Sequence, residues 1–300
     1  SSAVKTAALG PGDSLDSIKI DGRARSYLLH LPKGYSSTKR YPLVMVFHGG
    51  SGAGAKIAKQ THFSDYADRE GFIVVYPDGV EHNWNDGRGT TDAERLGVDD
   101  VKFVRTLIEH LRGEFQIDSA RIYATGVSNG GIFSHRLGCD MADVFAALGP
   151  VIGSLATNIV AACQPAAPIS VIVIQGTVDP FIPIDGGDTA HKSLGIGDGG
   201  LVESAASAMR LWASKNGCAE PPVRRTVPPA VDDGTFVTQT TYDTCRQETA
   251  VHYYIVNGMG HGWPPKASRA QRQQVSGPTS HNLDATRVIW EFFKSHSKSF

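Results

Sequence analysis

The fold is decided by residues 121–137, RIYATGVSNGGIFSHRL. The segment RIYAT predicts a strand and GIFSHRL predicts a helix, with a G-x-S-x-G pattern between them. Gly126 and Gly130 suit a tight corner because side chains at these positions would collide with the neighbouring strand and helix. The pattern therefore predicts a strand–turn–helix corner that holds Ser128 exposed and strained at the start of a helix, where developing negative charge is favoured.

Extended and helical segments alternate along almost the whole chain. Near-continuous apolar runs such as LVMVF, FIVVY and ISVIVI are typical of strands buried on both faces of a mostly parallel sheet. We expect strands at residues 25–31, 43–48, 72–76, 121–125, 170–175 and 251–256. We expect helices at residues 56–69, 98–115, 130–137, 201–215 and 282–295. The alternation predicts a three-layer α/β fold, with a mostly parallel central sheet and helices on both faces.

Three stretches depart from this alternation. Residues 185–200 contain six glycines and residues 262–278 contain three prolines, so both are expected to form long surface loops that shape a site. Residues 221–229 are expected to be irregular. Residues 18–20 and 25–31 predict an antiparallel hairpin at one edge of the sheet. No repeat or linker is visible, so we expect residues 1–300 to form a single catalytic domain.

The composition narrows the possible partners. The formal net charge is −1, and 41% of the residues are hydrophobic, which is ordinary for a soluble globular protein. Such a charge balance gives no reason to expect a nucleic acid or an anionic membrane surface as partner. No apolar run of about 18 residues is present, so no membrane-spanning segment is expected. The oligomeric state stays open.

The beginning of the chain and its cysteines bear on location. The chain starts at Ser1, with no methionine before Met45, which fits either removal of a secretory signal or a trimmed chain. The four cysteines are Cys139, Cys163, Cys218 and Cys245. Pairing neighbours along the chain is the simplest arrangement and would indicate a secreted protein, whereas four reduced, buried cysteines in a cytosolic protein are the alternative. No C-x-x-C spacing is present, so no metal site is expected.

A serine hydroxyl is a poor nucleophile unless a base takes its proton and an acid orients that base. In proteins whose catalytic serine sits at such a strand–turn–helix corner, the acid follows the serine along the chain and the histidine comes last. Asp179 follows the strand ISVIVIQG, at the sheet edge where Ser128 is expected. Asp185 and Asp188 lie further from the strand end, and Asp143 precedes the strand. Asp179 is therefore the expected acid.

His261 is the expected base. It lies in the segment GMGHGW, immediately after the strand VHYYIV and before the last helix. Small residues on both sides would let its imidazole turn towards Ser128. His252 falls inside the strand, His281 near the start of the helix, and His191 in the glycine-rich loop. These three are therefore weaker candidates.

A backbone loop that can stabilise an oxyanion follows the strand LVMV. The segment FHGGSG offers the N–H of Gly50 or Ser51, which together with the N–H of Asn129 would bind the oxyanion. Each such donor stabilises the transition state by about 3 kcal/mol. His48 in this segment is better explained as a residue that holds the loop. The expected chemistry is a two-step acyl transfer that needs neither a metal nor an organic cofactor.

At this point the sequence resembles the secreted esterases that include feruloyl and acetylxylan esterases and polyhydroxybutyrate depolymerase-like enzymes. The matching segments, in chain order, are RSYLLHLPKGY, YPLVMVFHGG, FIVVYPDG, WNDG, VDDVKFV, RIYATGVSNGG, GTVDPFIPIDGG, GMGHGWP and DATRVIWEFF. The resemblance implies an α/β-hydrolase fold, with Ser128 as nucleophile, Asp179 as acid and His261 as base. It also favours the disulfides Cys139–Cys163 and Cys218–Cys245.

The substrate is less sharply indicated. Trp84, Phe181 and Trp263 are predicted on loops at the edge of the sheet that carries Ser128, and an aromatic slot would suit a planar hydroxycinnamoyl group. The alternative is that these residues cover the core or hold loops. The expected substrates are feruloyl-type or acetyl esters, either small molecules or linked to plant polysaccharides. Short hydroxyalkanoate polyesters are the second possibility, and a non-catalytic binding protein is the third.

Two acidic residues at the start of a predicted helix need no catalytic explanation. Asp99 and Asp100 open the helix expected at residues 98–115. Carboxylates at this position cap free backbone N–H groups and complement the helix dipole. We therefore expect both to stabilise the helix.

Overall fold

The computed structural model describes residues 10–266 and 274–299. The strands of its large sheet are β1 (Gly12–Ile20), β2 (Arg23–Leu31), β3 (Tyr41–Phe47), β4 (Ile73–Pro77), β5 (Ile117–Val127), β6 (Ala147–Val151), β7 (Ser170–Gly176), β10 (Val223–Val227), β11 (Phe236–Tyr242) and β12 (Val251–Asn257). A small sheet contains β8 (Gly187–Asp188) and β9 (Leu201–Val202). The helices are α1 (Gly54–Thr61), α2 (Phe63–Glu70), α3 (Asp92–Arg95), α4 (Asp100–Glu114), α5 (Asn129–Asp140), α6 (Ala205–Asn216) and α8 (Ala285–Lys294), with short 3₁₀ turns η1 (Thr157–Ala162) and η2 (Arg246–Glu248).

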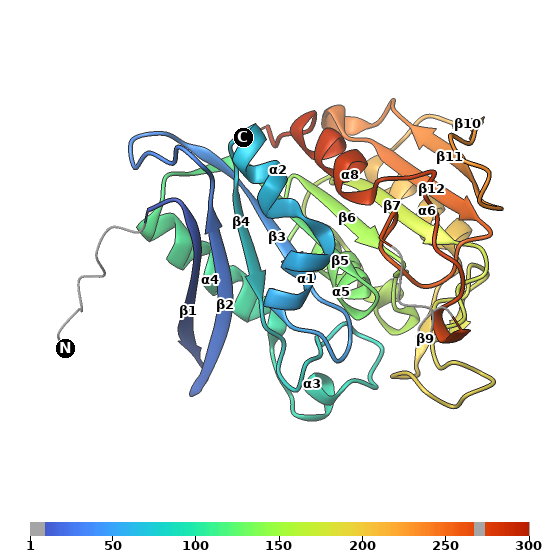
Figure 1. Ribbon diagram of the computed structural model, residues 1–300, viewed down its shortest axis with the longest axis horizontal. Helices are drawn as coiled ribbons and strands as arrows, with labels where there is room; N and C mark the ends of the chain where they lie inside the picture. The colour runs from blue at the N-terminus through green and yellow to red at the C-terminus, as the bar shows by residue number, and fades with distance from the viewer. Residues whose placement is uncertain (1–9, 267–273, 300) are drawn as a thin grey trace.

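The large sheet has the order β1-β2-β4-β3-β5-β6-β7-β12-β11-β10 (Figure 1). The six strands from β4 to β12 run parallel, while antiparallel pairs extend the sheet at both edges. The hairpin predicted at one edge is confirmed as β1 and β2. Since the central strands are parallel, the loops at their carboxyl ends gather at one edge of the sheet.

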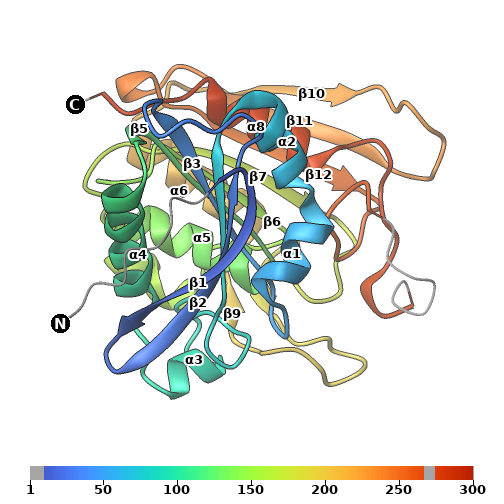
Figure 2. The same cartoon turned by 60° about the vertical axis from the view of Figure 1, so that its left-hand side comes forward.

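Helices cover both faces of the sheet, as Figures 1 and 2 show. Leu43, Met45 and Phe47 of β3 belong to the core cluster that contains residues of α4, α5 and α6. Val44 and Val46 belong to the cluster on the other face, with residues of α1, α2 and α8. Alternate residues of one strand thus supply two cores. The predicted three-layer α/β fold is confirmed.

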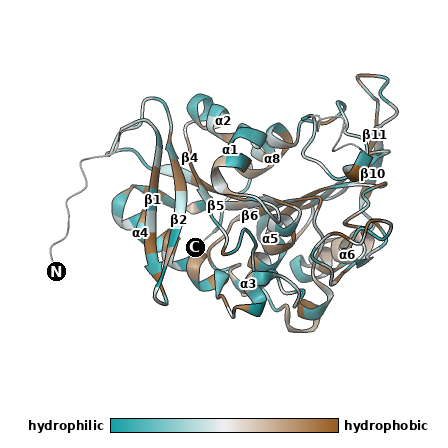
Figure 3. Ribbon diagram, turned by 60° about the horizontal axis from the view of Figure 1, so that its bottom comes forward, coloured by the Kyte–Doolittle hydropathy of each residue, from teal (hydrophilic) through white to brown (hydrophobic). Residues whose placement is uncertain are grey.

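Apolar residues gather along the strands, and polar residues lie on the outward sides of the helices (Figure 3). Within residues 10–266 and 274–299, no helix has the length and apolar character needed to cross a membrane.

Several boundaries differ from those predicted. The helix expected at residues 56–69 is two helices, because His62 between them adopts a left-handed conformation with φ 57°. The helix expected at 201–215 begins only at Ala205, since Leu201 and Val202 pair as β9 and Ser204 caps the helix through the N–H of Ser207.

Strands β6, β10 and β11 were not predicted, and β10 lies within residues 221–229, which were expected to be irregular. Strand β6 has the sequence ALGPV, in which glycine and proline hide the strand signal. Strand β10 is the exposed outer strand of the sheet and carries two arginines, so it lacks the apolar run of a central strand.

Two disulfides close loops on the α5 and α6 side of the sheet. Cys139 in the last turn of α5 is bonded to Cys163 just after η1. Cys218 after α6 is bonded to Cys245 before η2. Both bonds join neighbours along the chain, as the sequence suggested, and no cysteine is free.

Candidate active site

Ser128 stands at the corner between β5 and α5. Its backbone has φ 55° and ψ −120°, a strained conformation for a residue with a side chain. A Cβ atom on Gly126 would lie 2.4 Å from the carbonyl oxygen of Gly130, and one on Gly130 would lie 2.3 Å from that of Phe47. Both glycines are therefore required, and the predicted strand–turn–helix corner is present.

The strand register brings the other candidates to the same edge. Phe47 of β3 pairs with Gly126 of β5, and Gly176 of β7 pairs with Val256 of β12. Asp179 follows β7 and His261 follows β12, so the two residues leave neighbouring parallel strands.

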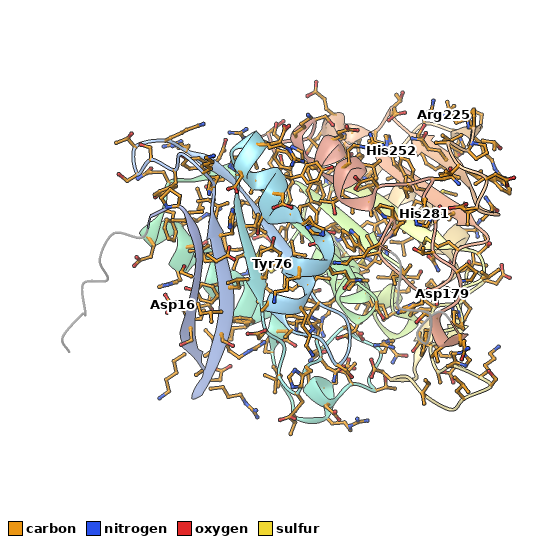
Figure 4. The ribbon with its side chains drawn as sticks, in the orientation of Figure 1. Asp16, Tyr76, Asp179, Arg225, His252 and His281 are labelled. Carbon is orange, nitrogen blue, oxygen red and sulfur yellow. A yellow bond between two sulfur atoms is a disulfide. The ribbon has the colours of Figure 1, made fainter. Side chains whose placement is uncertain are left out.

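His261 and Asp179 are hydrogen-bonded to each other. Nδ1 of His261 lies 2.8 Å from Oδ2 of Asp179, whose side chain is fully buried and which is labelled in Figure 4. The other oxygen of Asp179 accepts the backbone N–H groups of Phe181 and Ile182 at 2.8 and 2.9 Å. With Nδ1 donating to the carboxylate, Nε2 of His261 is left to accept a proton.

The competing histidines are engaged elsewhere. His252 lies 2.6 Å from Asp243, and His281 lies 3.2 Å from Asp233. Neither of them lines the pocket that contains Ser128, and His191 does not line it either, whereas His261 does. This pocket has a volume of about 980 Å³, and Asp179 lies behind His261 outside its lining.

The loop after β3 forms one wall of the pocket beside Ser128. A Cβ atom on Gly49 would lie 3.3 Å from Cβ of Ser128. The N–H of Ser51 donates to the carbonyl oxygen of His82 at 3.0 Å, so it is occupied within the loop. The prediction that the N–H of Ser51 binds the oxyanion is therefore wrong. Gly50, which also lines the pocket, stays a candidate.

His48 holds this loop. Its Nε2 accepts the backbone N–H of Gly79 at 3.0 Å, so the proton sits on Nδ1, which donates to the carbonyl oxygen of Gly49 at 2.7 Å. Burial lowers the pKa of His48 below its ordinary value, which favours this neutral form. These contacts agree with the structural role expected for His48.

Asn129, the residue after Ser128, is fixed through its side chain. Nδ2 donates to Oδ2 of Asp86 at 2.6 Å and to the carbonyl oxygen of Trp84 at 3.1 Å, while Oδ1 accepts the N–H of Trp84 at 2.8 Å. Asp86 is itself paired with Arg88 at 2.7 Å. The network orients the first residue of α5.

Of the three aromatic residues predicted to contact substrate, Trp84 does not reach the pocket. Its side chain is 0% exposed and packs against Phe47 and Phe133, with ring centres 5.1 and 5.3 Å away, and it donates to the carbonyl oxygen of His48. The prediction for Trp84 is wrong, and the alternative of a core residue that holds a loop is correct.

Trp263 and Phe181 do line the pocket. Trp263 is almost fully buried, and its indole N–H donates to Oγ1 of Thr286, so little of its surface is open to the cavity. Phe181 is half-buried, and its ring centre lies 5.0 Å from that of His261. Their contact with substrate stays a prediction.

Sequence reasoning missed the charged residues of the pocket. Lys56, Lys59 and Lys266 lie on its wall and are exposed. Arg88 and Asp198 lie on its wall as well, and Asp198 comes from the glycine-rich loop that was expected to shape a site. The part of the 262–278 loop between residues 267 and 273 lies outside the described residues.

The two acidic residues at the start of α4 differ in role. Asp99 caps the helix by accepting the N–H of Lys102 at 2.9 Å, as predicted. Asp100 instead forms a buried ion pair with Arg25 at 2.6 Å. Across the described parts of the chain, no group of three or more His, Cys, Asp or Glu side chains is placed to hold a metal ion.

The fold is shared with solved esterase structures. The acetyl xylan esterase from Aspergillus awamori matches with a TM-score of 0.58 at 12% identity, covering 94% of this chain and 99% of that one. A thermostable esterase matches with a TM-score of 0.56 at 17% identity, covering 95% of this chain and 63% of that one. These likenesses support the α/β-hydrolase fold.

Sequence comparisons reach further. NocK of Nocardia uniformis subsp. tsuyamanensis, a candidate esterase, is 29% identical over 279 residues, which are 92% of this chain and 80% of that protein. Feruloyl esterase B of Piromyces equi is 30% identical over 243 residues, which are 79% of this chain but only 42% of that enzyme. The family model described as "Esterase PHB depolymerase" matches residues 25–191, which is more than half of the chain. With esterases among both its relatives and its structural neighbours, this carboxylic ester hydrolase belongs to the esterase PHB depolymerase family.

Proposed function

We propose that the chain is a secreted serine esterase in which Ser128, His261 and Asp179 form the catalytic triad. The observation that carries the proposal is the 2.8 Å hydrogen bond between His261 and Asp179, with His261 and Ser128 lining one pocket. The strained corner at Ser128 and the buried carboxylate of Asp179 are what a nucleophile and an orienting acid require.

In the proposed mechanism the Oγ atom of Ser128 attacks the ester carbonyl while Nε2 of His261 takes its proton. Asp179 holds the imidazole in the correct tautomer and stabilises the imidazolium that forms. The backbone N–H groups of Gly50 and Asn129 are proposed to donate to the oxyanion. His261 then protonates the leaving alcohol, and water attacks the acyl-enzyme with His261 again acting as base.

The proposed substrates are feruloyl-type or acetyl esters of plant polysaccharides. The relative named feruloyl esterase B and the half-buried ring of Phe181 in the pocket support this choice. Hydrolysis of short polyhydroxyalkanoates is the second candidate, supported by the family model that matches residues 25–191.

One panel of substrates tests these proposals. Wild type and Ser128→Ala are compared on p-nitrophenyl acetate, methyl ferulate and a 3-hydroxybutyrate trimer. We expect wild type to hydrolyse at least one ester and Ser128→Ala to lose about 10⁶-fold in kcat. The ester with the highest kcat/KM then names the substrate class. Equal activity of both proteins would exclude Ser128 as the nucleophile.

Secretion is proposed from the two disulfides, because such bonds persist in oxidising compartments. The test is to express the natural gene in its own host and assay the culture supernatant and the cell lysate for the protein. Alkylation of the isolated native protein before and after reduction then counts its thiols. Four free thiols in the native protein would contradict the proposal.

A further inference from the structure

Asp198 is the acidic residue among the described residues that line the pocket. Its side chain is 34% exposed, and Oδ2 accepts one hydrogen bond, from Nη2 of Arg88 at 3.3 Å. Within the described residues no hydrogen bond reaches Oδ1. A carboxylate has about four lone-pair positions, so Asp198 retains acceptor capacity on the pocket side.

Arg88 holds this carboxylate in place. Its side chain is only 2% exposed, and the guanidinium donates to Asp86, to Oγ1 of Thr189 at 2.6 Å and to the carbonyl oxygen of Gly199 at 3.0 Å. With Asp86 and Asp198 both on Nη2, the donors of Arg88 are engaged within the protein. Arg88 therefore fixes the loop and leaves the recognition of a ligand to Asp198.

The glycines around Asp198 allow the backbone to hold this residue beside Arg88 at the pocket wall. Gly197, Gly199 and Gly200 have φ values of 114°, 69° and 85°, which disfavour residues with side chains. A Cβ atom on Gly200 would lie 2.8 Å from Cβ of Arg88. The glycines thus let the loop turn closely around the arginine and present Asp198 to the pocket.

Asp198 also lies beside the proposed reaction centre. A Cβ atom on Gly50 would lie 3.1 Å from Oδ2 of Asp198, so the lack of a side chain at Gly50 keeps this space open. On the other side, a Cβ atom on Gly197 would lie 3.4 Å from the ring of Phe181. A group that packs on Phe181 is therefore close to Asp198.

The positive charge of three lysines on the pocket wall indicates which kind of substrate group can donate to Asp198. Lys56, Lys59 and Lys266 line the pocket, and no salt bridge to any of them is found in the described residues. These ammonium groups disfavour a cationic ligand, so a neutral hydroxyl is the donor that suits Asp198.

Resting on the proposed serine esterase function, we propose that Asp198 is a specificity-determining residue that accepts a hydrogen bond from a hydroxyl group of the substrate. The preferred substrates are esters whose acyl part carries a free hydroxyl, such as a phenolic hydroxycinnamoyl or a hydroxyalkanoyl group. An ether oxygen at the same place offers no proton, so it would leave Oδ1 of Asp198 desolvated and without a hydrogen-bond donor.

Two substrate pairs test the proposal, each differing only in methylation of one hydroxyl. The first is methyl ferulate against methyl 3,4-dimethoxycinnamate, and the second is methyl 3-hydroxybutyrate against methyl 3-methoxybutyrate. A hydrogen bond to a charged group corresponds to about a 10- to 100-fold preference in kcat/KM for the hydroxylated ester. We expect wild type to show it in at least one pair, Asp198→Asn to retain part of it, and Asp198→Ala to lose it.

The readout is the ratio of the two kcat/KM values within a pair, so a loss of activity that affects both esters equally does not change it. Asp185→Asn is the matched control, because Asp185 is exposed on the same loop and lies outside the pocket lining, and it keeps the wild-type ratio. A wild-type ratio near one in both pairs, or an unchanged ratio in Asp198→Ala, would overturn the proposal. Failure of the serine esterase function is seen separately, as wild type inert on all four esters or Ser128→Ala fully active.

Discussion

The side chain of Asn129 donates a hydrogen bond to Asp86, with Nδ2 2.6 Å from Oδ2, although 43 residues separate the two in the chain. This bond orients the residue whose backbone N–H is proposed to bind the oxyanion. It also connects the start of α5 to the Arg88 network that holds Asp198. The proposed oxyanion site and the proposed specificity residue are thus held by the same hydrogen-bond network of Asp86 and Arg88.

Asn129→Ala is expected to lower kcat about 10-fold with little change in KM. The backbone N–H remains but loses its orientation, so the loss is smaller than the 10²- to 10³-fold cost of deleting a donor. Steady-state kinetics on p-nitrophenyl acetate measure the effect. Asn158→Ala is the matched control, because Asn158 donates to the carbonyl oxygen of Arg88 without touching the corner at Ser128. A change in KM alone would contradict the positioning role.

Asp179→Asn is expected to lower kcat by about 10⁴-fold, because the amide favours the wrong tautomer of His261. The carbonyl oxygen of the new side chain can still accept the N–H groups of Phe181 and Ile182, so the loop is kept. Single-turnover kinetics with p-nitrophenyl acetate check the acylation step, with Asp185→Asn as control. A loss below 10-fold would show that another acid orients His261.

Ser128→Gly is expected to be more stable than Ser128→Ala by about 1 kcal/mol. The backbone at residue 128 has φ 55°, and a conformation of this kind costs a residue with a side chain of order 1–3 kcal/mol. Part of that gain is offset by the greater entropy of glycine in the unfolded chain. Both variants are expected to be inactive, and chemical denaturation compares their free energies of unfolding. Equal stability would mean that the corner is not strained.

His135 is expected to make folding pH-dependent between about pH 4 and 6.5. Burial lowers the pKa of His135 to about 4, and its Nδ1 accepts the indole N–H of Trp212 at 3.0 Å. Between these pH values the unfolded chain binds a proton that the folded chain does not bind. Stability therefore falls as the pH is lowered through this window, by up to about 3 kcal/mol at its lower end.

Urea unfolding at pH 7 and pH 4.5 measures this effect. His135→Gln keeps an acceptor for Trp212 but cannot take up the proton, so its stability should depend less on pH than that of the wild type. His62→Gln is the control, since His62 is exposed on the surface. An unchanged pH dependence in His135→Gln would rule out His135 as the cause.

Removing either disulfide by a double Cys→Ala exchange is expected to cost about 3 kcal/mol. The sequence separations are 24 and 27 residues, so loop entropy predicts nearly equal losses for the Cys139–Cys163 and Cys218–Cys245 pairs. Denaturant unfolding of the two double variants tests this. A difference of more than about 2 kcal/mol would show that local packing outweighs chain entropy.

The elements that carry the proposed triad could be predicted because each follows a strand with a strong apolar signal. Ser128, Asp179 and His261 come within a few residues of β5, β7 and β12. Parallel strands put their carboxyl ends at one edge, so order along the chain was enough to place these residues together. The glycines around Ser128 added a local steric requirement that the sequence shows directly.

Contacts between distant segments could not be predicted. The N–H of Ser51 is occupied by the carbonyl oxygen of His82, and Trp84 turns into the core towards Phe133. Neither contact leaves a periodic pattern, because loop residues have no fixed inward or outward phase. Arg88 and Asp198 lie 110 positions apart and meet only when the glycine-rich loop folds back.

The register between β7 and β12 has a consequence for how the enzyme forms. Val171 pairs with Val251, so the strands that precede Asp179 and His261 can pair only when a loop of about 80 residues closes. Contacts so distant in the chain form slowly, since the entropy of closing a large loop is lost before the contacts contribute any stabilising free energy. Recovery of esterase activity during refolding is therefore expected to report completion of the central sheet, and a nascent chain that has not yet reached β12 lacks His261, the proposed base.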